Sequence, residues 1–441
     1  MKRLIDAQLL NWKDSSRRKP LIIRGGRQIG KTWSIEKLGL DSFNSFAKID
    51  LEKRRDLHGI FEGDLSSGNI LSQLSVVLQQ PIVPGETLLF FDEIQACPRA
   101  LMALRFLYEE IPELHVIAAG SLLEFASGDI SFPVGRVQFL NMYPLAYVEF
   151  LLAGGYEQLV AILQDPPTRQ TELVHQLLLN HLRQYFFVGG LPEAVEAYYD
   201  GAEKNGAGLL NAFEVQSEII DTYRLDFAKY APRANKFCLD NVLTSCAVRV
   251  GEQIKYSTLA GGFSNPTIRK AFDLLVMAKI IHKIPAARTI GIPIGADVNQ
   301  KKFKVSLIDI GLMRRLSGIP VDIEIRQPGL LDIYRGKLAE QFVAQEICAM
   351  QKNDLYYWAR DARGSSAEVD YLISGKAHIH PVEVKSGSTG SLKSLHMALS
   401  KYPDSGEGLV LSTGHYAELA EQRIRFIPLY YAGSMLATLS A

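Results

Sequence analysis

The sequence predicts an α/β protein of several domains, and three observations support this. The chain has 441 residues, more than one hydrophobic core usually organises, so two or three domains are expected. The run Thr87–Phe91 has buried-strand character at every position, as in a strand covered on both faces of a parallel sheet. Near the C-terminus, SSAEVDYLIS alternates polar and apolar residues, which indicates a second kind of strand.

Composition narrows the class of protein. The chain is 47% hydrophobic and 22% charged, as in globular proteins, and we expect no membrane partner. The N-terminal stretch MKRLIDAQLLNWKD lacks the features of a secretion signal, so a cytoplasmic location is expected. Lys and Arg together number 48, as do Asp and Glu. Residues 251–320 nevertheless hold eleven basic against four acidic residues, a local charge of +7, so this domain is basic inside a neutral chain.

The stretch PLIIRGGRQIGKTW predicts a phosphate-binding loop. A short apolar run precedes the pattern Gly, four residues, Gly-Lys-Thr. In such a loop backbone N–H groups and a helix N-terminus surround the phosphates, the lysine reaches their oxygens and the threonine coordinates magnesium. A helix is expected to follow the loop and to end near Gly39. The residues expected to bind the nucleotide are Gly25, Gly26, Arg27, Gln28, Ile29, Gly30, Lys31, Thr32 and Trp33.

A second motif, TLLFFDEIQ, follows about sixty residues later. Ligands bind at the carboxyl ends of strands in open parallel sheets, and here that end carries Asp92 and Glu93. Asp92 is expected to hold magnesium through water, and Glu93 to polarise the attacking water. Together with Lys31 and Thr32, this order of motifs predicts ATP and Mg²⁺ as cofactors.

Two further residues are candidates for the same site. Ser121 follows the strand candidate HVIAAG, where it would sense the γ-phosphate or act as a helix N-cap. Arg136 lies in a turn and would supply a cation to the transition state or remain a surface residue. Both alternatives are open for each residue.

These motifs, in the order RGGRQIGKT, LLFFDEIQACP, VIAAGS, VGR with MYPLAYVEF, and FFVGGLPEA, resemble the bacterial and archaeal AAA-type ATPases that carry an uncharacterised C-terminal domain. The resemblance covers nearly the whole chain. It implies that a Gly-x-Pro turn, here Gly190 and Pro192, approaches the nucleotide. Without the resemblance, the same turn is a loop before a helix.

The middle of the chain predicts helices and then a winged helix. Residues 209–251 show apolar residues at helical spacing, interrupted by Pro232, and favour a lid or connector. A short helix, a turn, a helix from about Asn265 and a strand pair follow, as in a winged helix. Four basic residues lie on or beside its second helix: Arg269, Lys270, Lys279 and Lys283. DNA binding and a structural lid are the two open interpretations.

The C-terminal segment holds a second group of candidate residues. Glu340 lies on an amphipathic helix, Asp370 on an alternating strand, and Glu383 and Lys385 on the next strand. Residues two apart on a strand share a face, and the neighbouring strand can bring Asp370 beside Glu383. Two adjacent carboxylates predict magnesium between them, with Lys385 orienting or activating a water against a phosphodiester.

This order of residues resembles the restriction-endonuclease-like nucleases, especially the Holliday-junction resolvase type. The resemblance implies that Glu340, Asp370, Glu383 and Lys385 are catalytic residues of a metal-dependent nuclease. A fold does not fix an activity, and a repurposed nuclease fold that binds partners is the alternative.

The predicted organisation has four parts: an AAA-like ATPase domain (1–155), a helical lid or connector (156–235), a winged-helix module (236–325) and a restriction-endonuclease-like domain (326–441). The predicted function is ATP hydrolysis coupled to a nuclease-like domain that acts on DNA or another nucleic acid. The alternatives are a nucleotide-dependent switch that binds a protein partner without cleavage, and a transcription regulator. A protein partner or a second copy of the chain is also expected among the partners.

Overall fold

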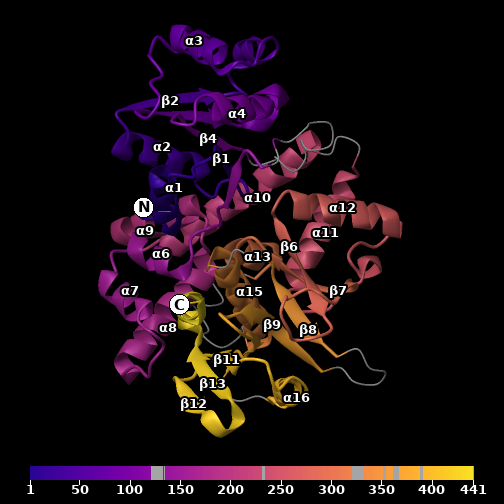
Figure 1. Cartoon of the computed structure of the whole chain (residues 1–441). Coiled ribbons are helices and arrows are strands. Elements are labelled where there is room, and N and C mark those ends of the chain that lie inside the picture. The colour runs from indigo at the N-terminus through magenta and orange to yellow at the C-terminus, as the bar shows by residue number, and fades with distance from the viewer. Residues whose placement is uncertain are drawn as a thin grey trace. The chain divides into compact units, whose positions relative to one another are not determined.

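The computed structural model describes residues 1–120, 133, 135–230, 234–319, 332–350, 354–360, 367–387 and 391–440 (Figure 1). The chain forms two compact units, residues 2–143 and residues 144–441 together with Met1. Each unit has its own sheet. The predicted domain boundaries at residues 155, 235 and 325 stay predictions.

The first unit is built on a five-stranded sheet with the order β2-β3-β4-β1-β5, in which every pair is parallel. Its strands are β1 (Leu21–Arg24), β2 (Ser45–Asp50), β3 (Thr87–Asp92), β4 (His115–Ala119) and β5 (Gln138–Asn141). Its helices are α1 (Leu4–Asp14), α2 (Lys31–Ser42), α3 (Ser67–Leu78) and α4 (Pro98–Glu110). Because all strands run the same way, the segments that follow β1 and β3 emerge at the same edge of the sheet.

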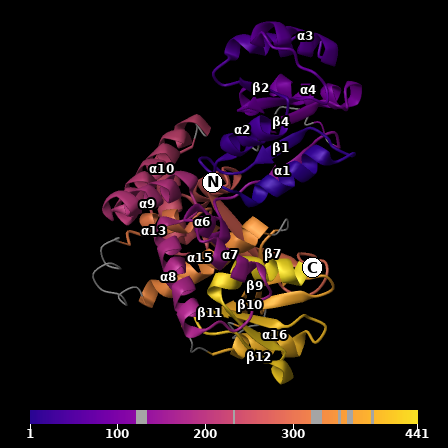
Figure 2. The ribbon, with the colours of Figure 1, turned by 90° about the vertical axis from the view of Figure 1, so that its left-hand side faces the viewer.

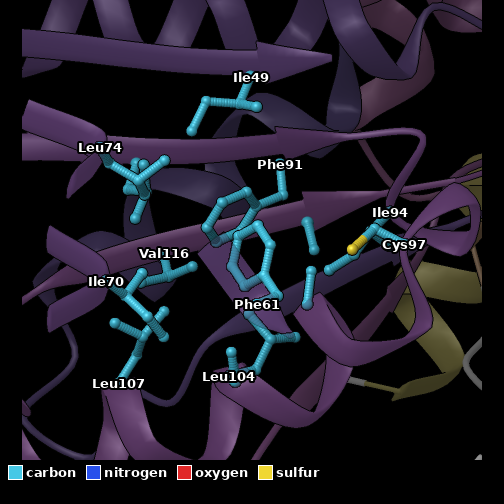
Figure 3. Packing of buried hydrophobic residues seen from close by; sticks show 14 of the residues in the cluster. Ile49, Phe61, Ile70, Leu74, Phe91, Ile94, Cys97, Leu104, Leu107 and Val116 are labelled. Carbon is cyan, nitrogen blue, oxygen red and sulfur yellow. The ribbon is translucent and has the colours of Figure 1, made fainter. Parts of the chain in front are cut away.

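The core of this unit explains the unbroken apolar strands. All residues of β3 and β4 are buried, as expected for central strands of a parallel sheet. On one face α3 and α4 supply the cover, with side chains such as Ile70 and Leu104 packed on the sheet (Figure 3). The rings of Phe61 and Phe91 meet edge to face at 5.8 Å, a favourable aromatic geometry. The strand ends are therefore fixed by a packed core.

The helix after the loop is longer than the sequence predicts. We expected it to end near Gly39, but α2 continues to Ser42. A Cβ on Gly39 would lie 2.3 Å from the Phe46 ring. This glycine therefore permits the helix to pack closely against β2, and it does not terminate the helix.

The second unit contains an eight-stranded mixed sheet with the order β12-β13-β11-β10-β9-β8-β6-β7. Its strands are β6 (Ile281–Ala287), β7 (Val298–Leu307), β8 (Tyr356–Ala359), β9 (Glu368–Ser374), β10 (Ile379–Val384), β11 (Gly408–Ser412), β12 (Ala417–Leu419) and β13 (Ile424–Pro428). In Figures 1 and 2 the strands after residue 350 run from orange to yellow, and α16 (Lys393–Lys401) packs beside β9 and β10.

Helices make up the rest of this unit. They are α6 (Tyr147–Ala153), α7 (Glu157–Gln164), α8 (Glu172–Val188), α9 (Pro192–Asn205), α10 (Gly208–Tyr230), α11 (Lys236–Val248), α12 (Asn265–Met277), α13 (Ile310–Leu316), α15 (Asp332–Met350) and α17 (Ala432–Ser440). Within the described ranges, none of the helices is both long and apolar enough to cross a lipid bilayer.

The hairpin of β6 and β7 joins the middle of the chain to the C-terminal sheet. It follows α12, where the sequence predicts a strand pair, and its strands are antiparallel; the winged helix stays a prediction. β6 also pairs in parallel with β8, at Ala286 with Tyr357 and Ala287 with Trp358. The hairpin therefore extends the C-terminal sheet, so residues far apart in the chain share one sheet.

Helix α15 carries an unusual set of buried polar side chains. Gln341 accepts a hydrogen bond from the Leu307 N–H and donates one to the Leu307 carbonyl, both at 2.8 Å. Gln345 accepts a hydrogen bond from the Ile310 N–H at 2.8 Å. Both glutamines satisfy backbone groups where β7 leads into α13, groups that would otherwise lie unpaired in the interior.

Two buried carboxyl groups complete this network. Asp309 accepts hydrogen bonds from the Gly190 N–H at 2.6 Å and from the Leu312 N–H at 3.0 Å. Glu346 accepts one from the Tyr147 N–H at 2.8 Å. Burial raises the pKa of Glu346 from 4.5 to about 8, because the charged form loses its hydration.

The buried Glu346 predicts a pH-dependent stability. Because the folded state binds this proton more tightly than the unfolded state, stability falls as pH rises from about 4.5 to about 8. Glu346→Gln keeps an acceptor for the Tyr147 N–H and cannot ionise. When the pH is raised from 6 to 8.5, we expect the melting temperature of the wild type to fall by about 3 °C more than that of Glu346→Gln. Glu157→Gln, on an exposed residue, is the matched control, and an identical pH profile for all three proteins would contradict the assignment.

Candidate functional site

The loop between β1 and α2 has the backbone of a phosphate-binding loop. Gly25 and Gly30 have φ values of +151° and +89°, a region that side chains with a Cβ rarely adopt. A Cβ on Gly25 would also lie 2.3 Å from the Met142 carbonyl oxygen. Helix α2 begins directly after Gly30, so its N-terminal N–H groups face the loop.

The lysine of the loop is held inside it. Lys31 is buried, and its Nζ donates hydrogen bonds to the carbonyl oxygens of Gly25 and Gly26 at 3.1 and 2.5 Å. An ammonium group at this place is positioned to exchange these carbonyls for phosphate oxygens.

The remaining loop residues differ in how they can contact a ligand. Ile29 is fully buried, so only its backbone is available to a nucleotide. Its carbonyl accepts a hydrogen bond from Nη1 of Arg3 at 2.9 Å, which fixes the loop against the start of α1. Gln28 and Trp33 are exposed and Arg27 is partly buried.

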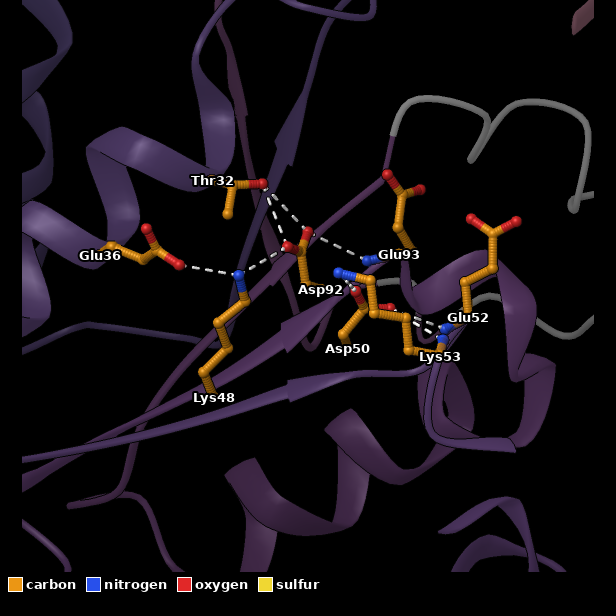
Figure 4. A network of polar contacts seen from close by, with 8 residues as sticks. All are labelled: Thr32, Glu36, Lys48, Asp50, Glu52, Lys53, Asp92 and Glu93. Atoms are coloured by element: carbon orange, nitrogen blue, oxygen red, sulfur yellow. Dashed lines mark hydrogen bonds and ion pairs between the residues drawn. The ribbon is translucent and has the colours of Figure 1, made fainter. Parts of the chain in front are cut away.

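The two sequence motifs meet at the carboxyl edge of the sheet (Figure 4). The Thr32 hydroxyl donates to a carboxylate oxygen of Asp92 at 3.1 Å, and Asp92 is only 6% exposed. Hydroxyl and carboxylate oxygens are suitable ligands for Mg²⁺. Thr32 and Asp92 therefore fit the magnesium that accompanies a nucleoside triphosphate.

Sequence reasoning missed Lys48, which lies on β2 beside this pair. Its Nζ forms ion pairs with Asp92 at 3.3 Å and with Glu36 at 2.8 Å (Figure 4). Burial lowers the pKa of Lys48, but the hydrogen bond to Glu36 and the charge of Asp92 outweigh it, and the net pKa is raised. Lys48 compensates the charge of Asp92, and only the pairing of β2 with β3 reveals it.

Glu93 follows β3 in a left-handed conformation with φ of +48°. Its carboxylate accepts a hydrogen bond from Nε2 of Gln95 at 2.5 Å. Non-glycine residues in this region are uncommon and often lie at functional sites. The turn directs Glu93 away from the strand, and Gln95, which the sequence did not single out, orients its carboxylate.

The structure does not bring every candidate to the loop. Arg136 precedes the amino end of β5 and forms an ion pair with Glu109 at 2.5 Å, near the C-terminal end of α4. Because β5 is parallel to β1, Arg136 lies at the edge opposite the loop of its own chain, and its role as a cation for the transition state stays a prediction. Ser121 lies outside the described residues. Pro192 begins α9 in the second unit, and its approach to the nucleotide stays a prediction.

The four C-terminal candidates converge in the second unit. The register of β9 and β10, extended by one pair, sets Asp370 opposite Glu383. Asp370 accepts a hydrogen bond from the Val384 N–H at 2.9 Å, and Nζ of Lys385 lies 2.6 Å from Oε1 of Glu383. Glu340 reaches the same place from α15. We call Glu340, Glu368, Asp370 and Glu383 the carboxylate cluster.

A lysine that sequence reasoning missed lies within the carboxylate cluster. Nζ of Lys304 is 3.1 Å from Asp370, 3.1 Å from Glu368 and 3.6 Å from Glu340. Its side chain is 1% exposed. The sequence signal that could have revealed Lys304 is a charged residue within the run Phe303–Leu307, which is buried throughout. Only the pairing of the strands shows which side chains Lys304 faces.

The charges of the carboxylate cluster shift its pKa values. Burial, and then the nearby Asp370, raise the pKa of Glu340 to about 8 and that of Glu383 to about 7. Burial lowers the pKa of Lys304, but the charges of Asp370, Glu340 and Glu368 outweigh it and hold that pKa well above its ordinary value. The surrounding carboxylates thus favour the protonated form of Lys304.

The predicted magnesium between Asp370 and Glu383 does not fit this arrangement. Oxygens of Asp370 already accept from Lys304 and from the Val384 N–H, and Oε1 of Glu383 pairs with Lys385. Among the described residues, no group of three or more His, Cys, Asp or Glu side chains is arranged to hold a metal ion.

Family models match three parts of the chain. Residues 17–151 match an AAA domain. Residues 179–322 and 335–432 match two domains of unknown function, DUF8612 and DUF4143 respectively. With the loop and the Thr32–Asp92 contact, the first match shows that the N-terminal unit is a P-loop domain of the AAA ATPase type. No curated protein matches the chain.

Solved structures give only distant similarity. ORC1 of Aeropyrum pernix in complex with DNA is 13% identical, with a TM-score of 0.30 over 74% of this chain and 95% of that chain. A RuvB variant of Thermotoga maritima is 15% identical, with a TM-score of 0.29 over 67% and 91%. PCH-2 of C. elegans is 14% identical, with a TM-score of 0.28 over 48% and 65%. These low scores give no information on what this chain binds.

Proposed function

We propose that the chain binds and hydrolyses ATP with Mg²⁺ at the loop of its N-terminal unit, and that its nucleotide state controls the C-terminal unit. The observation that carries the first part is the contact of Thr32 with Asp92 at 3.1 Å. It unites the two motifs that hold magnesium and phosphate in P-loop ATPases.

Each residue of the site then has a role in hydrolysis. Lys31, now bonded to loop carbonyls, would bind the β- and γ-phosphate oxygens. Thr32 and Asp92 would hold Mg²⁺, which neutralises charge on those phosphates when bound. Glu93, oriented by Gln95, would position the attacking water. Lys48 would keep Asp92 in place before the metal arrives.

A physical route for control runs through the second unit. The Gly190 N–H is bonded to Asp309, and Asp309 also accepts from Gln345 of α15 at 3.4 Å. The same helix carries Glu340. If the Gly190 turn responds to nucleotide, as the resemblance to AAA-type ATPases implies, α15 would transmit that response to the carboxylate cluster.

Two outputs of the C-terminal unit are candidates. Convergence of Glu340, Asp370, Glu383 and Lys385 favours the restriction-endonuclease-like fold and a nuclease acting on nucleic acid. The exposed Arg269 and Lys270 on α12 are candidates for phosphate contacts if the winged helix binds DNA. The pairing of Lys304 with three carboxylates favours the other candidate, a switch that binds a partner and cleaves nothing.

Lys31→Ala tests the nucleotide site. We expect turnover of ATP to fall about 100-fold or more, because one preorganised cation facing the phosphates is removed. Steady-state phosphate release is the measurement. Lys37→Ala, on a surface residue of the same helix paired with Asp6, is the control, and equal turnover in both variants would sink the assignment.

Glu93→Gln separates binding from hydrolysis. The variant should bind ATP normally and hydrolyse it about 100-fold more slowly, since the amide cannot accept a proton from water. Equilibrium binding of a fluorescent ATP analogue and single-turnover hydrolysis give the two values. Glu86→Gln, an exposed residue before β3, is the control. Unchanged hydrolysis would mean that another residue positions the water.

A cleavage assay decides between the two outputs. Purified protein is incubated with Mg²⁺ or Mn²⁺, with and without ATP, on single-stranded, double-stranded and branched DNA and on RNA. We expect no cleavage that depends on Asp370, because Lys304 pairs with that carboxylate. Cleavage that disappears in Asp370→Ala would establish the nuclease. Salt-dependent DNA binding without cleavage would point to phosphate contacts by the winged-helix residues.

A further inference from the structure

We infer that the ammonium group of Lys304 serves the carboxylate cluster as an internal cation, in place of a divalent metal. The hairpin of β6 and β7 supplies this lysine. This inference concerns the chemistry of the cluster alone and does not rest on ATP hydrolysis at the loop. It assigns a role to a residue that neither motif of the sequence includes.

The first support is the position of the ammonium group. Nζ of Lys304 lies within 3.6 Å of carboxylate oxygens from Glu340 on α15 and from Glu368 and Asp370 on β9. A metal bound by Asp370 together with Glu340 would have to occupy the space beside these same oxygens. A positive charge already there opposes a second cation, because like charges at this distance repel.

The second support is the burial of the lysine. A buried ammonium is costly unless it is paired and hydrogen-bonded, and here three carboxylates provide the pairing. Its Nζ also lies over the ring of Tyr357, 5.3 Å from the ring centroid. The side chain of Lys304 is 1% exposed, so its charge is compensated by these neighbours and not by water.

The third support is that the paired side chains come from stretches that match two different domain families. Lys304 lies in the stretch that matches DUF8612, whereas Glu340, Glu368 and Asp370 lie in the stretch that matches DUF4143. The ion pairs thus fasten the two stretches together. Removal of Lys304 would leave three buried carboxylates without this cation, a destabilising change, whereas removal of one carboxylate leaves Lys304 two others.

The experiment measures binding of Mn²⁺ to the full-length, nucleotide-free protein by the EPR signal of the free ion. Wild type and Asp370→Asn should bind the same amount, since the cluster takes up no metal in either. Binding of one additional Mn²⁺ per chain by the wild type, lost in Asp370→Asn, would overturn the inference. This comparison needs no change at Lys304.

Lys304→Met supplies the converse test, because its side chain has a similar length and no charge. We expect it to gain one Mn²⁺ per chain and to lose that gain when combined with Asp370→Asn. Lys301→Met, on an exposed lysine of the same strand, should gain none. A folded Lys304→Met protein that gains no Mn²⁺ would also overturn the inference. If Lys304→Met does not fold, the comparison of wild type with Asp370→Asn decides.

Discussion

The second unit is organised by charged and polar side chains buried beneath α15, which pair with groups from distant segments of the chain. Carboxylates, glutamines and a lysine lie in its interior, and each depends on a partner from another segment of the chain: Glu346 on the Tyr147 N–H, Asp309 on the Gly190 N–H, and Lys304 on Asp370. These partners lie as far as 223 positions apart in the sequence, from Tyr147 to Asp370. Buried polar networks of this kind are costly when one member is missing, so the helices, the hairpin and the C-terminal strands depend on one another.

The first unit depends on a simpler constraint. Its strands are all parallel, so polar residues that follow β1 and β3 meet at one edge although sixty residues separate Thr32 from Asp92. The apolar core under α3 and α4 fixes that edge, and glycines with positive φ let the loop curve where a phosphate would lie. The same constraint places Arg136 at the opposite edge of its own chain.

The two units differ in how the charges of their acidic residues are compensated. Thr32 and Asp92 lie together at the carboxyl edge of the first sheet, where the ammonium group of Lys48 pairs with Asp92. The carboxylate cluster has several carboxylates, but an ammonium group of the chain already pairs with three of them. Two sites that both look suited to magnesium in the sequence therefore differ in the folded chain, because charge compensation is decided by all neighbours in space.

The sequence by itself determined the local features. The glycine pattern and the lysine of the loop, the apolar run of β3 that ends in Asp92, and the alternation that puts Asp370 and Glu383 on facing strands are set by residue type and spacing, and periodicity reports these directly. Only the tertiary structure showed Lys48 beside Asp92, Arg136 away from the loop, and Lys304 among the carboxylates. Those relations join strands or helices distant in sequence. These relations arise from the order of the strands and from the pairing of the β6–β7 hairpin with β8. Strand order and hairpin pairing leave no repeating pattern in the sequence.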